Sequence, residues 1–386
     1  PRRGLTSMLR NKVIIAGVGD SDIGKVPDMS GLALNAQAVK RALDDAGMRM
    51  KDVDGLLTAY SLTEPYFMLG TVLAEYLGLQ PTYCASLVVG GGTLGAALHH
   101  AAMAVTTGQA KVVLVTCGEN RATGQSRDEA VNALTQVGHP YFENPYGPLV
   151  PAFYAMVTQR YMHEFGTQRE DLAHVAVRAR HHAVRHPNSP MKSEITVDDV
   201  LASKPIAEPL NMLDCCFISD AAGAFIVTTP DRAADLANRP AWLWGIGECH
   251  THEHITLAPS LTEFGAVQSG SQAYEMAGVG PKDIDFAELY DCFTIVPIIE
   301  AEELGLAERG SGGELFASGE TAIEGRLPIN THGGLLSYAQ AGASGGIHGI
   351  VEAVRQLRGG ESARQVPKHD IALIHNEGGV LSSHCT

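Results

Sequence analysis

The sequence predicts an α/β fold of two similar halves, with a long insertion in the first half. Residues 42–54 and 273–285 repeat one pattern of helix, turn and strand. A second repeat places glycine-rich stretches, 90–93 and 342–346, before a helix and an apolar strand. Residues 119–210 have no counterpart of similar length in the second half. We therefore expect two pseudo-twofold related βαβαβ halves, with active-site loops between them at the strand ends.

The first half begins with an apolar strand at 13–18. The next helix ends at Gly47, because glycine readily adopts the left-handed conformation that closes a helix, and a Lys-Asp-Val-Asp turn then leads to a strand. Gly90-Gly91-Gly92 opens an alanine-rich helix that closes at Gly108. The apolar run 112–115 is the strand that follows it.

The insertion contains a turn-rich stretch at 139–148 and two helices, at 153–164 and about 170–185. A short strand at 224–227 then completes the first half. Such insertions commonly cover the substrate, but they also form dimer surfaces. The predicted domains are the first half at 1–118 plus 211–238, the inserted loop domain at 119–210, and the second half at 239–386.

The second half repeats this order of elements. Its first strand is expected at 242–246, and its first helix ends at Gly278 before a Lys-Asp-Ile-Asp turn. A later helix opens at 342–346 and closes near Gly359, and the strand 371–374 follows. Alternation of strands and helices at this rhythm indicates an α/β sheet.

The composition and charge of the chain disfavour several classes of protein. Hydrophobic residues make up 45% of the 386 residues and the net charge is -15, which disfavours a nucleic-acid partner because such binders need clustered Lys and Arg. The run 13–18 is too short for a membrane span or a signal peptide. Seven cysteines without paired CxxC motifs are typical of reduced thiols, so we expect a cytoplasmic protein.

Several motifs resemble one family. The glycine-rich turn at 90–95 and the stretch 330–337, followed by Gly-Ala-Ser-Gly-Gly at 342–346, resemble thiolases of the sterol-carrier-protein, or lipid-transfer, type. The insertion agrees, with similar motifs at 180–183, 196–201 and 219–224. The resemblance covers essentially the whole chain. It implies the thiolase fold, in which two halves form a layered αβαβα arrangement.

The resemblance also shows what this chain lacks. Thiolases use a cysteine at the start of a helix, where the helix dipole favours the thiolate, together with a histidine and a second cysteine. The equivalent positions here hold Gly91, Gln340 and His375. Cys84 lies several residues too early to be the nucleophile unless it is displaced. Acyl transfer through a cysteine thioester is therefore disfavoured.

Two tyrosines accompany these losses. Tyr290 begins the segment that aligns with the Asn-Glu-Ala-Phe element of thiolases, and Tyr338 precedes the turn that lost its histidine. A phenol is a competent proton donor to an alkoxide or enolate. The pattern resembles the thiolase-like aldolases of bacterial steroid side-chain degradation, which cleave a β-hydroxyacyl-CoA by a retro-aldol reaction and work with a small OB-fold partner protein.

That resemblance implies a set of roles. Tyr290 and Tyr338 carry the two proton transfers, in an order that the sequence leaves open, and both should reach one pocket. His332 and the backbone at Gly378 and Gly379 hold the thioester oxygen, and Gly91 leaves room for substrate. Asp291 orients a neighbour or caps a helix that starts near Phe293.

The implied products are a ring ketone and a short acyl-CoA such as propionyl-CoA. No cofactor is expected beyond the coenzyme A of the substrate, and no metal. A homodimer across the sheet edge of the first half is expected, possibly flanked by two partner chains.

Other interpretations stay open. The chain is alternatively an acyltransferase that uses Cys84 or Cys292, or a carrier of acyl-CoA or lipid without catalysis. The run Cys249-His250-Thr251-His252-Glu253-His254 offers three imidazoles on one face if it is a strand, which is the material of a zinc site, although a polar strand or loop is the commoner reading. The basic helix at 178–186 is either a solvated face or a site for CoA phosphates or an acidic partner.

Overall fold

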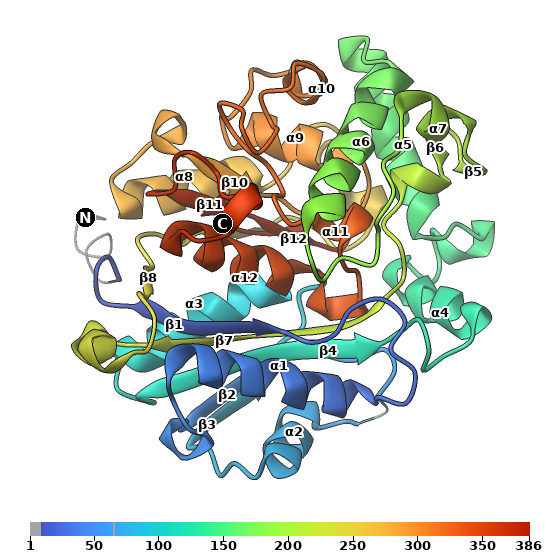
Figure 1. Cartoon of the computed structure of the whole chain (residues 1–386). Helices are drawn as coiled ribbons and strands as arrows, with labels where there is room; N and C mark the ends of the chain where they lie inside the picture. Colours follow the sequence, from blue (N-terminus) through green and yellow to red (C-terminus); the bar gives the residue numbers. More distant parts are fainter. Residues whose placement is uncertain (1–8, 65) are drawn as a thin grey trace.

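A computed structural model describes residues 9–64 and 66–386. Figure 1 shows five layers: two helices below a large sheet, two helices in the middle, the strands of the second half, and further helices above them. This is the predicted αβαβα arrangement. The insertion lies to one side, beside both halves. No helix in the described part of the chain is long and apolar enough to cross a membrane.

The sheet of the first half has six strands in the order β3-β2-β4-β7-β1-β8. β7 runs antiparallel to both of its neighbours, β1 and β4. Strands β1 and β7 are buried along their whole length, which explains their continuous apolar sequences. The bounds are β1 Ile14–Asp20, β2 Gly55–Thr58, β3 Tyr83–Ser86, β4 Val112–Asn120, β7 Asp220–Thr228 and β8 Ala241–Trp242.

Four helices cover the two faces of this sheet (Figure 1). α1 (Gly31–Ala46) and α2 (Leu69–Leu77) lie on the outer face, and α3 (Thr93–Thr106) and α12 (Gly345–Arg358) form the middle layer. α1 ends at Gly47 with φ 70°, as predicted from the glycine. The core between the sheet and the middle layer includes Val113, Phe225, Leu94 and Ile347.

The second half has shorter strands. β10 (Phe286–Glu288) pairs with β11 (Ala372–Ile374), and β13 (Ser383–Cys385) lies between β12 (Asn376–Gly378) and β9 (Glu248–His250). Only His375 separates β11 from β12, so these two are successive parts of one extended segment. The helices α8 (Ala266–Ala277) and α9 (Ile295–Glu303) cover these strands.

One predicted strand is wrong. Residues 242–246 were expected to begin the second half, but β8 joins the first sheet, where Trp242 pairs with Ile14. The N–H of Leu243 donates to the carbonyl of Val13 at 3.1 Å, which keeps the chain on β1. The second half then begins its own pairing at β9, after a crossing segment at 243–247.

The insertion contains the two expected helices, slightly longer than predicted. α5 spans Val150–Phe165 and α6 spans Arg169–Arg185. α6 packs against α11 (Gly334–Ser337) and α10 (Gly312–Ala317) of the second half. The remaining elements of the insertion are α4 Arg127–Ala133, α7 Val197–Ala202, β5 Pro205–Ala207 and β6 Leu210–Asn211.

Candidate active site

The glycine-rich turn between β3 and α3 forms one wall of the candidate site. Thr93, the first residue of α3, donates its hydroxyl to the carbonyl of Gly90 at 2.6 Å and accepts the N–H of Val89 at 3.0 Å. Gly90 has φ 60°, a conformation that residues with a Cβ rarely adopt. The turn is therefore fixed by its own side chain and by glycine.

Tyr290 covers this turn. A Cβ atom at Gly91 would overlap both the Tyr290 hydroxyl and the carbonyl oxygen of Glu377. The phenol thus fills the space beside Gly91, the position that the sequence resemblance equates with the thiolase nucleophile. Gly91 was expected to leave room for substrate, but the structure places the Tyr290 hydroxyl in that space.

Gly378 and Gly379 form the opposite wall. A Cβ at Gly90 would come within 2.6 Å of the Gly379 nitrogen and 2.8 Å of the Gly378 Cα. The two backbone segments therefore touch without intervening side chains, and glycine at both positions allows this approach. The structure brings Gly91, Tyr290, Gly378 and Gly379 into one place.

A small cavity of about 10 Å³ lies beside Tyr290. Its lining includes Tyr290, His332, His375 and Asn376. The Nδ1 atom of His332 is 2.9 Å from the Oε2 atom of Glu288, and both side chains are buried. Burial opposes the charged imidazole, but the carboxylate of Glu288 outweighs it and raises the pKa of His332. His332 thus lines this cavity with an imidazole that is paired to a buried carboxyl group.

Asp291 binds the backbone of α11 and does not cap α9, the helix that follows it in the chain. Its carboxylate accepts the N–H of Leu335 at 2.6 Å, in the first turn of α11. α9 begins at Ile295 without a side-chain cap, so the capping role near Phe293 is not observed. Burial raises the pKa of Asp291 to about 6. Asp291 thereby positions the helix that carries Tyr338 at its end.

Tyr338 lies in a different set of contacts from Tyr290. Its hydroxyl donates to Asp20 at 3.2 Å, at the end of β1, and its ring meets those of His332, His186 and His348 edge-on. The cavity beside Tyr290 is not lined by Tyr338. His332 is the link between them, because it lines that cavity and contacts the Tyr338 ring at a centroid distance of 5.1 Å. The sequence predicted that Tyr290 and Tyr338 reach one pocket, but their two hydroxyls do not lie in a common pocket.

Asp20 holds the Tyr338 hydroxyl within a buried charge network. Its carboxylate also binds His348 at 2.8 Å and Arg355 at 2.7 Å, both on α12. Burial alone would raise the pKa of Asp20, but Arg355 and His348 lower it far below its usual range. Burial and the negative charge of Asp20 raise the pKa of Tyr338 well above 10.0. Tyr338 is thus protonated at neutral pH.

Two residues of the site were missed in the sequence. Glu377 accepts the hydroxyl of Tyr154 at 2.5 Å and the thiol of Cys292 at 3.2 Å, and it is 1% exposed. Burial raises its pKa to about 7. Tyr154 comes from α5 of the insertion, so only the folded chain reveals this contact. The signal for Glu377 was a charged residue directly before Gly378. All three residues of this strand, β12, are buried.

The thiols are poorly suited to nucleophilic attack. Burial raises the pKa of each of the seven cysteines, and a neutral thiol is a weak nucleophile. Cys84 lies in β3, and Cys292 is buried beside Glu377. The seven are Cys84, Cys117, Cys215, Cys216, Cys249, Cys292 and Cys385.

Two other segments were considered as sites, the run 249–254 and the basic helix 178–186. The run 249–254 is a strand only to His250, and no group of three His, Cys, Asp or Glu side chains among the described residues is arranged to hold a metal. In the basic helix, His182 is buried against the carbonyl of Asn330, and Arg185 pairs with Glu324. The helix is therefore not a fully solvated face, because several of its polar side chains contact other parts of the protein. Fewer of these side chains are free to bind CoA phosphates or an acidic partner.

Comparisons with known proteins show the family to which the chain belongs. The model of the thiolase N-terminal domain matches residues 13–231, and that of the thiolase C-terminal domain matches residues 247–386. The chain is 37% identical to a 17-hydroxy-3-oxo-4-pregnene-20-carboxyl-CoA lyase of Mycobacterium tuberculosis, over 97% of this chain and 99% of that protein. It is 36% identical to a steroid side-chain-cleaving aldolase of Thermomonospora curvata, over 92% of each.

A solved structure described as the Ltp2-ChsH2(DUF35) aldolase is also similar. It superposes with a TM-score of 0.85 at 35% identity and covers 98% of this chain and 97% of the solved chain.

Proposed function

Because the chain belongs to the thiolase superfamily, of the sterol-carrier-protein type, we propose that it cleaves a β-hydroxyacyl-CoA by a retro-aldol reaction. The substrate class is a steroid side-chain CoA thioester with a 17-hydroxyl group, and the products are a ring ketone and propionyl-CoA. The relatives that carry such names support this choice. The observation that carries it is the Tyr290 hydroxyl over Gly91, where a thiolase nucleophile would be.

The reaction needs two proton transfers. A base takes the proton of the β-hydroxyl, the bond between the α- and β-carbons breaks, and its electron pair forms the thioester enolate while the carbonyl of the ketone forms. An acid then protonates the α-carbon. The pKa of Tyr290 is raised well above 10.0 by burial and by Cys292 and Glu377, so the phenol is the protonated partner. Glu377, at a pKa of about 7, gains and loses a proton near neutral pH.

His332 suits the enolate oxygen. Its imidazole lines the cavity beside Tyr290, and a hydrogen-bond donor that is fixed in a buried site stabilises a developing oxyanion. The backbone at Gly378 and Gly379 approaches the same region without side chains. We propose that Tyr338 carries the other proton transfer, which requires substrate to draw its hydroxyl away from Asp20.

The decisive assay follows cleavage of the steroid CoA thioester with the purified chain and its partner protein. Tyr290→Phe should lower kcat by about 10²–10⁴-fold, because general acid catalysis contributes that much. Tyr274→Phe is the matched control, since this tyrosine bonds the carbonyl of Leu304 from α8. Full activity of Tyr290→Phe would sink the assignment.

Mass spectrometry of the chain with an acyl-CoA separates the rival functions. An acyl adduct on a cysteine would support a transferase, whereas the aldolase leaves every thiol free. Absence of turnover with the partner present would favour a carrier.

The partner is proposed to be a small OB-fold protein. The support is the similar solved structure, whose description joins two named components. Copurification of both chains from one host, followed by mass measurement of the complex, tests this and gives the stoichiometry.

A further inference from the structure

Gln340 lies at the position for which the resemblance to thiolases predicts a histidine, in the segment between α11 and α12. One residue of the first half holds its backbone on both sides. The N–H of Gln340 donates to the Ser219 hydroxyl at 2.9 Å, and its carbonyl accepts the Ser219 N–H at 3.1 Å. Ser219 is buried and directly precedes β7. The side chain of Gln340 therefore starts from a point that both halves fix.

The side-chain amide of Gln340 lies beside the hydroxyl of Tyr290, with Nε2 3.5 Å from the phenol oxygen. Its Oε1 atom lies against Gly345, where an added Cβ would approach it to 2.5 Å. Gly345 begins α12, and the unpaired backbone N–H groups in the first turn of a helix favour an oxygen nearby. The carbonyl of the amide therefore belongs on the side of the helix, and its NH2 group on the side of the phenol.

This hydrogen bond leaves the proton of Tyr290 uncommitted. An amide nitrogen only donates, so the phenol oxygen accepts and its own proton points elsewhere. Within the described part of the chain, the Tyr290 hydroxyl makes no other hydrogen bond. Tyr154 differs, because it donates to the carboxyl group of Glu377, and Tyr338 likewise donates to Asp20. Of these three buried tyrosines, Tyr290 is the one whose proton is available to a bound substrate.

The amide also favours the phenolate that remains after Tyr290 donates its proton. Burial, Cys292 and Glu377 raise the pKa of Tyr290, and the hydrogen bond from Gln340 acts in the opposite direction. A donor aimed at an oxygen that gains negative charge is most effective in a buried site. Glutamine suits this task because it does not ionise, whereas a carboxylate would accept the phenol proton and a histidine would exchange protons itself.

We propose that Gln340 is the positioning residue of Tyr290, which directs the phenol proton toward the substrate and stabilises the phenolate. The inference rests on the proposed retro-aldol reaction, in which Tyr290 is a proton donor. It gives a task to the residue that occupies the position of the absent thiolase histidine.

Gln340→Glu tests the direction of the hydrogen bond, because it keeps the shape of the side chain. A protonated carboxyl group still donates to the phenol oxygen, whereas an ionised one only accepts and takes up the phenol proton. In the steroid CoA assay with the partner present, kcat should therefore fall at high pH toward that of Tyr290→Phe, about 10²–10⁴-fold below the wild type. A pH profile that coincides with the wild-type profile would overturn the proposal.

The comparison is a difference between pH profiles. The titratable groups Cys216, Cys292 and Glu377 around the phenol are present in the wild type as well, so only the added fall at high pH belongs to the new carboxyl group. Gln109→Glu, at an exposed position just after α3, is the matched control and should keep the wild-type profile.

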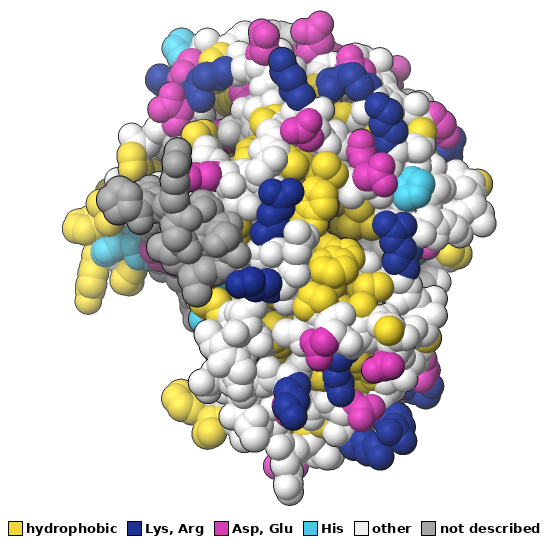
Figure 2. All heavy atoms as spheres, turned by 90° about the vertical axis from the view of Figure 1, so that its left-hand side faces the viewer, with side chains coloured by type: hydrophobic (Ala, Val, Ile, Leu, Met, Phe, Trp, Pro, Cys, Tyr) yellow, Lys and Arg dark blue, Asp and Glu magenta, His cyan; other side chains and the backbone are white. Residues whose placement is uncertain are grey.

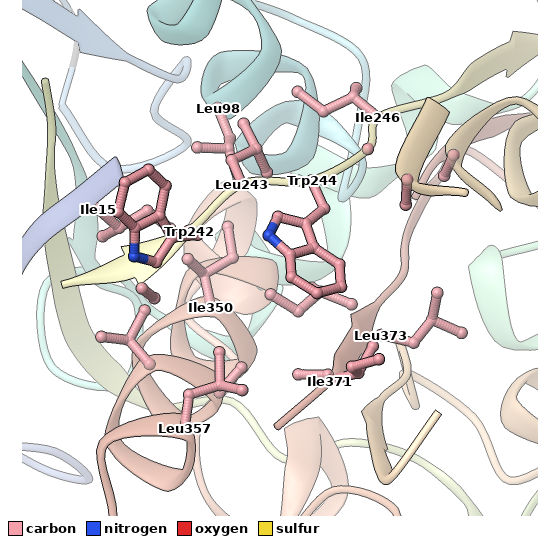
Figure 3. A pocket seen from close by; sticks show the side chains of 18 of the residues that line it. Ile15, Leu98, Trp242, Leu243, Trp244, Ile246, Ile350, Leu357, Ile371 and Leu373 are labelled. Carbon is pink, nitrogen blue, oxygen red and sulfur yellow. The ribbon is translucent and has the colours of Figure 1, made fainter. Parts of the chain in front are cut away.

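Tryptophan fluorescence shows whether each variant is folded. Trp242 and Trp244, the two tryptophans of the chain, line a cavity of about 560 Å³ between residues 243–247 and β11. Figure 2 shows hydrophobic side chains gathered in the middle of the face on which β8 lies, and in Figure 3 apolar side chains of α12 and β11 surround the indole of Trp244. Neither indole lines the small cavity beside Tyr290. Wild-type emission and a wild-type urea midpoint therefore exclude misfolding as the cause of a lost activity.

Gln340→Leu removes the donor and decides the question if the glutamate variant does not fold. Its kcat should fall by about 10²-fold at every pH, as for a misplaced catalytic group, with KM unchanged. Combined with Tyr290→Phe, it should slow the reaction no further, because Gln340 acts only through the phenol. Losses that multiply in the double variant would show a role independent of Tyr290 and overturn the proposal.

The same set of variants separates this inference from the proposed reaction. Full activity of Tyr290→Phe would refute the reaction itself. If Tyr290→Phe loses activity while both Gln340 variants behave as the wild type, the reaction stands and the positioning role is wrong.

Discussion

Glu377 makes folding stability depend on pH. Its pKa is about 7 in the folded chain against 4.5 ordinarily, so the folded state binds the proton more tightly than the unfolded state. The stability from this carboxyl is present in full below pH 4.5 and is lost as pH rises through 7. Between pH 5 and 8 the free energy of unfolding should fall by about 2–3 kcal/mol more in the wild type than in Glu377→Gln. Urea titrations at both pH values measure the difference. Parallel pH profiles of the two proteins would show that Glu377 is not the titrating group.

Gly91 tests how tightly Tyr290 is held. Gly91→Ala forces the phenol to move, because the added methyl overlaps its hydroxyl, and overpacking costs about 1–3 kcal/mol of stability. Activity should fall with it, since the proton donor is displaced. Gly280→Ala is the matched control, because only the Asp283 carboxylate lies near the added carbon, at 3.9 Å. Wild-type Tm and turnover in Gly91→Ala would mean that Tyr290 lies elsewhere in solution.

At the scale of elements, the Asp20 network joins β1 to α12. Asp20→Ala leaves Arg355 and His348 without their carboxylate partner in a buried site, so unfolding should become about 3–5 kcal/mol easier. Asp44→Ala removes the exposed pair with Lys40 and should change stability by less than about 1 kcal/mol. Denaturant midpoints compare the two. A similar small effect of both variants would show that the buried network contributes little.

Local sequence patterns predicted the ends of helices correctly where a single residue determines the end. Gly47 and Gly278 end α1 and α8 as expected, because a left-handed cap requires no partner elsewhere in the chain. The strand at 242–246 failed for the opposite reason. Its apolar residues suit either sheet, and only the pairing of residues 241–243 with β1 in the folded chain decides between them.

Some residues of the candidate site also lie together as the sequence predicted, while their roles stay predictions. Tyr290, Gly91 and the Gly378-Gly379 turn come together because the fold places both halves face to face at their strand ends. Glu377 with Tyr154 could not be predicted, since 223 residues separate the two. The contact of Tyr338 with Asp20 spans 318 residues and was likewise invisible.

At the scale of the whole molecule, we propose a homodimer across β3, the edge strand of the first sheet. Cys84 and Ser86 on this strand are exposed, and Val88 just beyond it is 67% exposed. Val88→Glu should give monomers, because a charge on a sheet edge opposes pairing. Val267→Glu, on α8, is the control and should remain dimeric. Sedimentation velocity distinguishes the species, and a monomeric wild type would refute the proposal.

The overlap between Gly91 and Tyr290 also limits the routes open to evolution. A cysteine at position 91 has no space while the phenol is present, and removing the phenol first leaves a hole with no nucleophile beside it. Restoring a cysteine nucleophile at position 91 would therefore need a change at Tyr290 as well, in addition to the histidine and second cysteine whose expected positions hold Gln340 and His375. Selection that acts on one change at a time opposes such a combined route.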